Sequence, residues 1–418
     1  MESSSGTAAS ILVTAIAVLL VAAATACASP LVNKTIHIPD GSVIDCVDIH
    51  QQPALKHAPP GHRQIQAKPK RNMKAIAAEA SVSKREERPQ TWRKYGSCPS
   101  GTVPIRRASR HANTEVVDMA RRASPFGRRH PAAAATAGAS SNFSTLNGAL
   151  NGKVERAVAY STDGPYLGAR ADVTLWKVNV HPNEFSMNYI LIGNTVDPNY
   201  DPTPGGNPPA SLTNQIAVGF VAWPALYGDS VSRLFVYYTT DGGNQKNCYN
   251  LECGGFHLQE SEYALGDSWS DDTTSQVGGQ RYFVTFGIHR DPALLNWWVT
   301  VMDKEIGYYP EDIFDKTFPE AVYVEMGGQV LDTRPGGNHT TTPMGNGIPS
   351  CGGSRFAALI MNYLGVDAGG KLFNDGADTT ITTTPSCYGA NPLGFNTPNY
   401  GYNFAYGGPG GIYCEKPE

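Results

Sequence analysis

The sequence predicts an all-β protein, an antiparallel β-sandwich, preceded by a small basic pro-segment. Three observations support this prediction. Apolar and polar residues alternate with period two in several stretches of the second half of the chain, as in half-buried strands. The 418 residues include 44 glycines and 30 prolines, which leave little room for long helices. The front and back parts of the chain carry opposite charge.

An uncharged, apolar stretch lies near the N-terminus. Residues 11–26 are rich in Ala, Val and Leu and lead into the small residues Ala26 and Ala28. The stretch is short for a membrane span, which needs about 20 residues. The small residues fit cleavage of a secretory signal before Ser29. We therefore expect residues 1–28 to be a signal peptide, with no membrane attachment after its removal. An uncleaved anchor is the alternative, because Glu2 is acidic and no Lys or Arg precedes the stretch.

The charge of the chain is strongly divided. Residues 29–130 contain 19 Lys and Arg against 8 Asp and Glu, a net charge of +11. Residues 131–418 contain 14 Lys and Arg against 28 Asp and Glu, a net charge of −14. Opposite charges favour contact, so we expect residues 29–130 to be a pro-segment that binds the rest of the chain in cis. A solvated basic linker is the alternative. The overall net charge of −4 gives no indication of nucleic-acid binding.

A Pro-, Ala- and Gly-rich linker is expected at residues 131–153, ahead of a domain at residues 154–418. Two basic pairs precede the linker, Arg121-Arg122 and Arg128-Arg129. Exposed basic pairs at a domain boundary are suited to proteolysis. Whether the chain is cut there, and at which pair, stays open.

The cysteines indicate disulfides rather than a metal site. Seven cysteines remain once Cys27 leaves with the signal, and the sequence contains neither CxxC nor HExxH, so we expect no metal and no cofactor. We expect the pairs Cys46–Cys98, Cys248–Cys253 and Cys387–Cys414, which leave Cys351 over. Glycosylation acceptor triplets at Asn33, Asn142 and Asn338 agree with a secreted glycoprotein.

Period-two alternation predicts strands at residues 170–180, 215–221, 233–238, 281–287, 296–301 and 321–330. Clusters of Gly, Asn, Asp and Pro separate these stretches. Short helices are expected near residues 72–80 and 113–122, and a helical turn at residues 310–315, where Pro310 precedes acidic residues. Many short strands joined by turns are typical of sandwiches and barrels.

A set of motifs occurs in order between residues 40 and 414. The pro-segment has Val-Ile-Asp-Cys-Val-Asp-Ile at residues 43–49 and Gly-Ser-Cys-Pro-Ser-Gly-Thr-Val-Pro-Ile at residues 96–105. Later come Pro-Ala-Leu-Tyr-Gly-Asp (224–229), Cys-Tyr-Asn-Leu-Glu-Cys-Gly-Gly-Phe (248–256), Gly-Tyr-Tyr-Pro (307–310), Pro-Met-Gly-Asn-Gly (343–347) and Tyr-Gly-Gly-Pro (406–409). Each motif is modest, but the ordered set resembles the neprosin family of secreted plant proteins.

The resemblance implies a β-sandwich of the glutamic-peptidase type, with residues 29–130 as its activation peptide. It also implies cleavage of peptide bonds after proline at acid pH, by two carboxyl groups and no metal. One carboxyl would activate water, and the other would stabilise the oxyanion or donate a proton. The expected location is extracellular, in the cell wall or apoplast, or vacuolar.

Both glutamate positions of the family are substituted in this chain. The first lies in an Asn-x-Ile-Glu-x-Gly-Trp strand, which here reads Asn-Gln-Ile-Ala-Val-Gly-Phe, so Ala217 replaces the glutamate. The second ends a Trp-Gly-Gly-Glu motif, which here reads Met-Gly-Gly-Gln and places Gln329 there. Neither residue can take a proton from water. We therefore predict a pseudoenzyme that keeps a cleft for proline-containing peptides or cell-wall glycoproteins.

Two alternatives remain. The first is an active acid prolyl endopeptidase with a relocated carboxylate such as Glu325. This residue shares a strand face with Gln329 but lies about 13 Å away, unless a bulge intervenes. The second is a structural or carbohydrate-binding cell-wall protein that uses its many aromatic residues. The aromatic candidates for the cleft are Trp297, Trp298, Tyr237 and Tyr238, and alternation predicts that one of the two tryptophans lies in the core.

Overall fold

The computed structural model describes residues 31–56, 64–80, 87–107, 141–142, 152–195, 213–243, 246–334, 338–395 and 401–414. The expected signal peptide, the helix near residues 113–122 and both dibasic pairs lie outside this part of the chain. Within it, no helix is long and apolar enough to cross a membrane.

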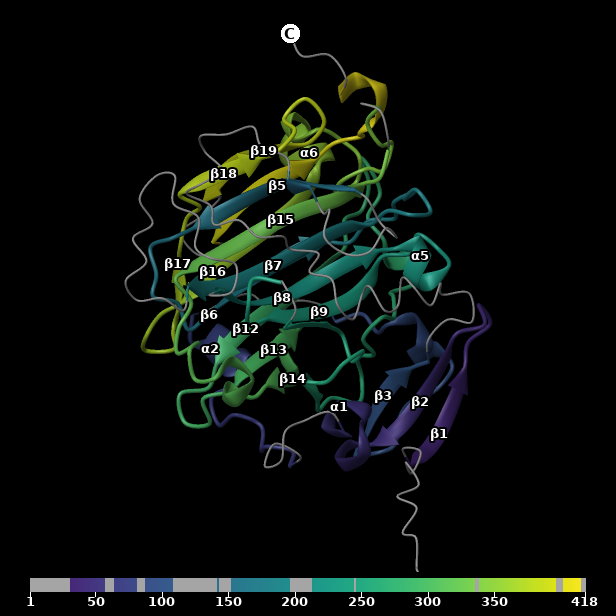
Figure 1. Cartoon of the computed structure of the whole chain (residues 1–418), viewed down its shortest axis with the longest axis vertical. Coiled ribbons are helices and arrows are strands. Elements are labelled where there is room, and N and C mark those ends of the chain that lie inside the picture. The colour runs from purple at the N-terminus through teal and green to yellow at the C-terminus, as the bar shows by residue number, and fades with distance from the viewer. Residues whose placement is uncertain are drawn as a thin grey trace, which may run out of the picture.

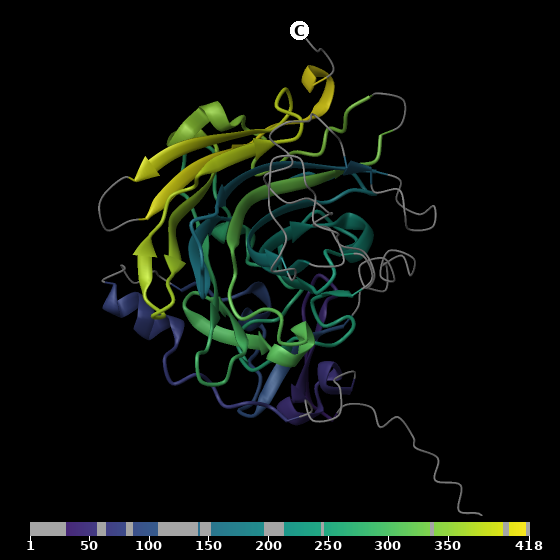
Figure 2. The same ribbon diagram turned by 60° about the vertical axis from the view of Figure 1, so that its left-hand side comes forward.

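Two antiparallel sheets form the body of the protein, which confirms the predicted sandwich (Figures 1 and 2). The first sheet has the order β10 (Asn247–Tyr249), β9 (Arg233–Thr239), β8 (Thr213–Ala222), β7 (Ser186–Thr195), β15 (Tyr323–Asp332), β5 (Lys153–Ser161) and β18 (Thr379–Thr382), with β4 (Ser141–Asn142) beside β5. The second has the order β11 (His257–Leu258), β14 (Lys304–Tyr309), β13 (Trp297–Val301), β12 (Phe283–Arg290), β6 (Gly168–Thr174), β16 (Ala358–Val366), β20 (Tyr402–Gly407) and β19 (Gly389–Phe395), with β17 (Leu372–Asn374) beside β16.

The main hydrophobic core lies between the two sheets. Ile216 and Val324 of the first sheet and Phe286 and Val299 of the second are all fully buried in it. Phe220 on β8 meets Phe286 on β12 edge to face, with ring centroids 5.0 Å apart. Such edge-to-face pairs contribute beyond their buried area, and this one joins the two sheets directly.

The strand prediction for residues 170–180 is wrong in its second half. β6 ends at Thr174, although Leu175, Trp176 and Val178 continue into the core. The main chain bonds elsewhere beyond this point: the amide of Leu175 donates to the carbonyl of Tyr282. Beyond Thr174, alternation therefore reflects burial in the core rather than pairing with a neighbouring strand.

The helices are short. α2 (Met73–Glu79) forms where a helix is expected near residues 72–80, and the side chain of Asn72 caps it by accepting from the amide of Ala75. A 3₁₀ turn at Glu311–Phe314 follows Pro310. The remaining α-helical segments are single turns: α1 (Pro53–Lys56), α5 (Pro224–Tyr227) and α6 (Gly353–Phe356).

The pro-segment forms a third, three-stranded sheet of β1 (Val32–His37), β2 (Val43–Asp48) and β3 (Thr102–Arg106), which lies at the lower edge of the body in Figures 1 and 2. Two buried glutamines attach the pro-segment to the body. Gln52 exchanges two hydrogen bonds of 2.9 Å with the main chain of Leu258. Gln90 bonds the main chain of Ala264 in the same way. The pro-segment is therefore held in cis by neutral hydrogen bonds as well as by charge.

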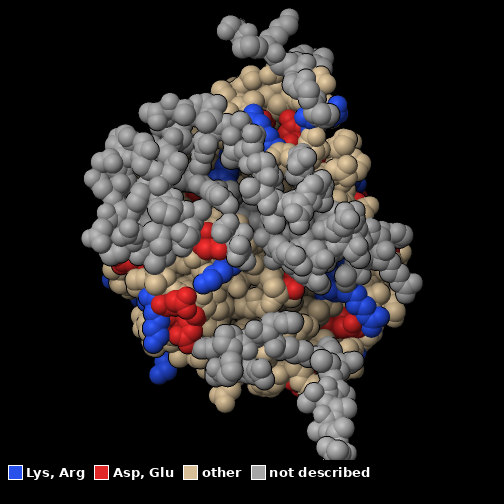
Figure 3. Space-filling view, in the orientation of Figure 1, with Lys and Arg blue, Asp and Glu red and all other residues tan. Residues whose placement is uncertain are grey.

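Four charges alternate across the contact between pro-segment and body. Arg93 of the pro-segment lies 3.1 Å from Glu262, Glu262 pairs with Lys304, and Lys304 lies 2.9 Å from Glu87 of the pro-segment. Burial would raise the pKa of Glu262, but Lys304 and Arg93 outweigh burial and lower it. On the visible face, basic and acidic side chains lie side by side rather than in separate patches (Figure 3).

In a Glu262→Gln variant, the stability of the contact between pro-segment and body should depend less on pH than in the native chain. A lowered pKa means that Glu262 stabilises the contact fully above its ordinary value of 4.5. This stabilisation is lost as the pH falls through the folded value. We expect the charge of Glu262 to stabilise the contact by about 0.5–1 kcal/mol, because the paired side chains are partly exposed. Hydrogen exchange of residues 90–95, corrected for intrinsic rates, between pH 3 and 7 measures the effect.

The matched control for this variant is Glu320→Gln, an exposed site. The control should follow the native pH dependence, with faster exchange at low pH. Equal pH dependence in the native chain and the Glu262→Gln variant would contradict the assignment.

Candidate functional site

Ala217 and Gln329, the two positions predicted to replace family glutamates, lie on the face of the first sheet that points away from the second. Across the strands, Ala217 lies opposite Leu191, Leu191 opposite Glu325, and Glu325 opposite Tyr160. Directly opposed residues share a face, and so do residues four apart along one strand. Ala217, Glu325 and Gln329 therefore define one surface, the candidate face, formed by β8, β7 and β15 in the middle of the sheet (Figure 1).

Ala217 brings no polar side-chain atom to the candidate face. It is fully buried, with Leu191 opposite on β7 and Tyr237 opposite on β9. A methyl group can neither accept nor donate a proton. This position therefore has no acid–base chemistry of its own.

Gln329 is an amide at the second position and is also fully buried. Its Nε2 lies 3.4 Å from Sδ of Met187, and its Oε1 accepts from the hydroxyl of Tyr189 at 3.5 Å. The contact with the Tyr189 hydroxyl is long for a hydrogen bond between oxygens. An amide can polarise a carbonyl or hold an oxyanion, but it cannot act as a general base.

Glu325 is the one member of this trio that is a carboxylate, and both of its oxygens are engaged. Tyr160 donates to Oε2 and Tyr189 donates to Oε1. Arg156 places its Nη1 3.8 Å from Oε2. Only 2% of Glu325 is exposed, so the carboxylate is a buried anion held by two hydroxyls and a guanidinium. This arrangement suits a structural role.

The groups that contact Glu325 keep their protons. Burial raises the pKa of Tyr160 and of Tyr189 well above the usual value, and the charge of Glu325 adds to this shift. Burial alone would lower the pKa of Arg156, but Glu325 outweighs burial and raises it. The two tyrosines therefore stay hydroxyl donors, and Arg156 stays a cation.

Tyr189 connects Glu325 with Gln329. β15 passes Gly327 and Gly328 without a register shift against β5 or β7, so no bulge shortens the distance along the strand. The hydroxyl of Tyr189 nevertheless contacts both side chains. Sequence reasoning missed this link, because Tyr189 lies in an apolar run without alternation and the strand register that aligns it cannot be read from the chain.

Two glycines keep the backbone close around Tyr189. Gly219 and Gly327 lie opposite it on the two neighbouring strands. A Cβ at Gly219 would lie 2.1 Å from the carbonyl oxygen of Asn188, and one at Gly327, with φ of 147°, would lie 2.4 Å from that of Ala157. Neither position has room for a side chain.

Comparison with known families decides the identity of the chain. Residues 35–153 match the family model of the neprosin activation peptide, and residues 182–409, more than half of the chain, match that of the neprosin domain. The chain belongs to the neprosin family. The resemblance found in the sequence motifs is thereby confirmed. Ala217, Glu325 and Gln329 all lie within the matched neprosin domain.

Solved structures resemble this neprosin-family chain only weakly. CG-16, a homodimeric agglutinin from chicken liver, is 12% identical, with 42% of this chain and 92% of the agglutinin covered and a TM-score of 0.20. A glycoside hydrolase family 16 endo-glucanase from Bacteroides ovatus is 11% identical, with 46% of this chain and 71% of the endo-glucanase covered and a TM-score of 0.24. Scytalido-glutamic peptidase is 7% identical, with 62% of this chain and 99% of the peptidase covered and a TM-score of 0.26. Function is therefore argued from the side chains.

The four aromatic candidates lie on different surfaces. Tyr237 is on the candidate face, directly opposite Ala217. Trp297 lies in the core between the sheets, and Tyr238 packs against that core. Trp298 alternates with Trp297 and so points to the outer face of the second sheet. The structure thus brings one of the four to the substituted positions.

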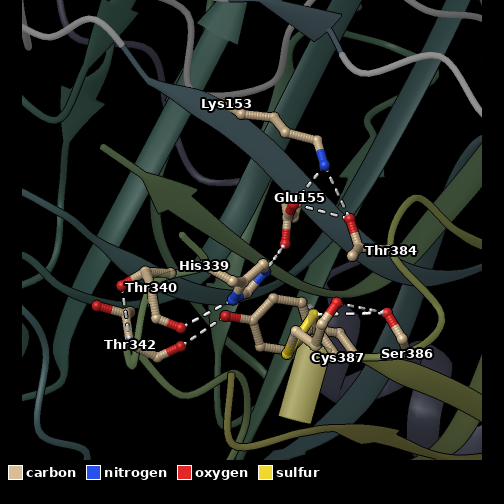
Figure 4. Close-up of a disulfide and its surroundings, with 10 residues drawn as sticks. Lys153, Glu155, His339, Thr340, Thr342, Thr384, Ser386 and Cys387 are labelled. Atoms are coloured by element: carbon tan, nitrogen blue, oxygen red, sulfur yellow. Dashed lines mark hydrogen bonds and ion pairs between the residues drawn. A yellow bond between two sulfur atoms is a disulfide. The ribbon is translucent and has the colours of Figure 1, made fainter. Parts of the chain in front are cut away.

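The three expected disulfides are formed, and Cys351 is exposed and without a disulfide partner among the described residues. A polar cluster lies beside Cys387–Cys414 (Figure 4). Glu155 accepts from Lys153 at 2.6 Å and from Thr384 at 2.7 Å, and it lies 2.6 Å from Nε2 of His339. Nδ1 of His339 lies 2.8 Å from the carbonyl oxygen of Thr340. Both ring nitrogens thus face acceptors, which favours the protonated ring.

Asp332 completes a possible metal-ligand group. Its carboxylate, that of Glu155 and the imidazole of His339 have ligand atoms within 4.8 Å of one another. The ammonium of Lys153 already binds Glu155, however, and would oppose a metal cation there. The sulfurs near His339 are joined in the disulfide. We therefore assign this cluster to charge pairing.

A His339→Gln variant should lose stability in a pH-dependent way. Burial alone would raise the pKa of Glu155, but His339 and Lys153 lower it, so Glu155 stabilises above 4.5 and less as the pH falls through its folded value. Burial alone would lower the pKa of His339, but Glu155 raises it, so His339 stabilises below 6.5 and less as the pH rises through its folded value. We expect a loss of about 1–3 kcal/mol near pH 5.5 that shrinks toward pH 9.

Urea unfolding at pH 5.5 and pH 9 measures this loss, with the exposed His50→Gln as the control. A loss that is equal at both pH values would show that His339 acts through packing rather than charge.

Removal of the Glu325 carboxylate should be costly. Glu325→Ala leaves the charge of Arg156 buried and uncompensated, so we expect a loss of about 3–5 kcal/mol in the free energy of unfolding. The double variant Glu325→Leu with Arg156→Leu should recover part of this loss, because a buried ion pair can be replaced by apolar side chains. Urea denaturation of the single and double variants checks both statements. A cost below 1 kcal/mol for Glu325→Ala would contradict the structural role.

Proposed function

We propose that this neprosin-family protein is a secreted pseudoenzyme that binds proline-containing peptides or cell-wall glycoproteins without cutting them. One observation carries the proposal. At the two positions where the family resemblance implies catalytic carboxyls, the chain has a methyl group and an amide, both fully buried on the same face.

The proposal follows from the chemistry of peptide hydrolysis. A water molecule must lose a proton as it attacks, and general acid–base catalysis commonly contributes about 10²–10⁴-fold to the rate. Ala217 and Gln329 offer no base. Glu325 has both oxygens engaged by tyrosine hydroxyls, which counts against a relocated mechanism that would use it. An oxyanion could still be held by the amide of Gln329, but holding it without a base does not activate water.

Binding is the activity that the candidate face still supports. Its tyrosines, Tyr160, Tyr189, Tyr237 and Tyr323, belong to one cluster. Aromatic rings offer flat surfaces to proline rings, and their hydroxyls offer hydrogen bonds. These side chains are buried in the intact chain, so ligand binding requires an opening step. Proteolysis at Arg121-Arg122 or Arg128-Arg129 is the step that we expect.

Restoring both glutamates should restore hydrolysis. The full-length chain and its Ala217→Glu/Gln329→Glu variant are each tested before and after tryptic cutting, on a proline-containing peptide between pH 2.5 and 5. We expect no cleavage by the native chain and cleavage after proline by the double variant. The reason is that two facing carboxyls can share one proton in acid. Mass spectrometry of the products gives the cleaved bond.

Single variants serve as controls, since each restores only one carboxyl and should stay at least about 10²-fold slower than the double variant. Cleavage by the native chain would overturn the proposal, and its loss in Glu325→Gln would identify a relocated carboxylate. Native binding to oligosaccharides but not to proline peptides would favour a carbohydrate-binding wall protein instead.

A further inference from the structure

The outer face of the second sheet carries two rows of side chains in register across its strands. One row is Arg170, Gly287, Thr300 and Glu305, on β6, β12, β13 and β14. The next row is Gly168, His289, Trp298 and Tyr308 on the same strands. We call the part formed by Gly287, Trp298, Thr300, Glu305 and Tyr308 the strap face. Trp297 and Val299 lie in the core, so the strap face points away from the first sheet and from Ala217 and Gln329.

The strap face is covered. Trp298, Thr300 and Tyr308 point outward from the sandwich, yet all three are fully buried. Residues 64–80 of the pro-segment, which end in α2 and are here called the strap, bond Tyr308 and Glu305 on this face and place Met73 beside Gly287. In Figure 1, α2 lies far from the three-stranded sheet of the same pro-segment.

Part of the binding of the strap runs through its own main chain. The amide of Gln66 donates to the hydroxyl of Tyr308 at 2.9 Å, and its carbonyl accepts from Nε2 of Gln259 at 2.6 Å. The amide of Met73 donates to Oε1 of Glu305 at 2.6 Å. Main-chain bonds do not depend on side-chain identity, so another peptide that starts a helix at the position of Met73 could make them equally well.

Three side chains of the strap add selectivity. Met73 is fully buried, and its Cε would lie 3.2 Å from a Cβ at Gly287, so the absence of a side chain at Gly287 makes room for it. Lys68 lies 3.1 Å from Glu260. Pro69, which lies between Lys68 and Met73 in the sequence, is buried. The rings of Trp298 and Tyr308 lie 4.8 Å apart on the strap face, and aromatic surfaces that take proline-containing segments are a recurring mode of peptide recognition.

The strap leaves polar groups of the strap face unused. Nε1 of Trp298 and Oγ1 of Thr300 are buried without a hydrogen-bond partner among the described residues. Buried donors are normally paired, so the strap is an incomplete occupant. A ligand with an acceptor at these points would bind better than the strap does.

We propose that the strap face is a second peptide-binding site. The strap occupies it in cis, and once the strap leaves, the site takes an extended basic segment of another protein with a proline and an unbranched apolar anchor. This inference does not rest on the fate of Ala217 or Gln329, because the two sites lie on different sheets.

The first test uses a full-length chain with recognition sequences for a site-specific protease placed in residues 57–63 and 81–86, so that the strap alone can be excised. The probe is a fluorescent peptide of residues 64–80. We expect the cut chain to bind the probe at least 100-fold more tightly than the uncut chain, where the tethered strap competes at high effective concentration. Met73→Glu in the probe should weaken binding at least tenfold. Lys68→Glu should weaken it severalfold, and a scrambled probe should not bind. Equal binding of native and scrambled probes would overturn the proposal.

Circular dichroism shows whether the protein stays folded after excision. Displacement is then measured in the uncut chain, where excess probe should speed hydrogen exchange in α2 and a scrambled probe should not. No effect of the native probe would overturn the proposal. A library of strap peptides varied at residues 67 and 70–72 tests the claim that the site takes a segment of another protein. Peptides with an added acceptor should bind at least tenfold more tightly than the strap. If the native strap sequence binds most tightly, the site serves the pro-segment alone.

Discussion

The central strands of the first sheet are buried on both faces, and this constraint governs which groups they can carry. All ten residues of β15 are buried, and so is the described part of β7 and nearly all of β8. A charge in such a place must be paired and hydrogen-bonded. Glu325 meets this condition through two tyrosine hydroxyls and Arg156. A second carboxylate four residues along the strand would have to find partners of its own, and an amide at Gln329 avoids that cost.

The same constraint explains which parts of the fold could be predicted from the sequence. β9, β12 and β13 lie where alternation predicts them, because apolar core-facing residues alternate with residues such as Arg233, His289 and Thr300 on the other face, although that face is buried as well. β7 runs Met-Asn-Tyr-Ile-Leu-Ile through a segment buried on both faces, so its apolar residues form a continuous run and no period appears. At Leu175 and Val178 the strand prediction fails in the opposite way, because these residues are buried in the core without belonging to a strand.

The candidate site divides in a similar manner. Ala217 and Gln329 are assigned to the glutamate positions from motifs alone, and this assignment stays a prediction. Arg156, Tyr160 and Tyr189 could not be found in this way, because their link to Glu325 depends on the register of three strands that are distant in the sequence. Charge composition likewise predicts attraction between pro-segment and body but not its place. The described ion pairs sit at the edge of the second sheet, and Gln52 and Gln90, which carry no charge, bond the body most directly.

The position of these contacts separates two properties that a pro-segment usually combines. The glutamines and the strap of the pro-segment bind to the second sheet and the loop after β11. Its strand β3 adds Val103 to the core, and Arg106 lies over the ring of Tyr227. Ala217, Glu325 and Gln329 lie on the outer face of the first sheet. The sandwich core stands between the two surfaces. None of the contacts described for the strap involves Ala217, Glu325 or Gln329. Attachment of the strap and access to the candidate face can thus be selected independently. A chain with Ala217 and Gln329 on one surface can then still keep an intact strap on the other.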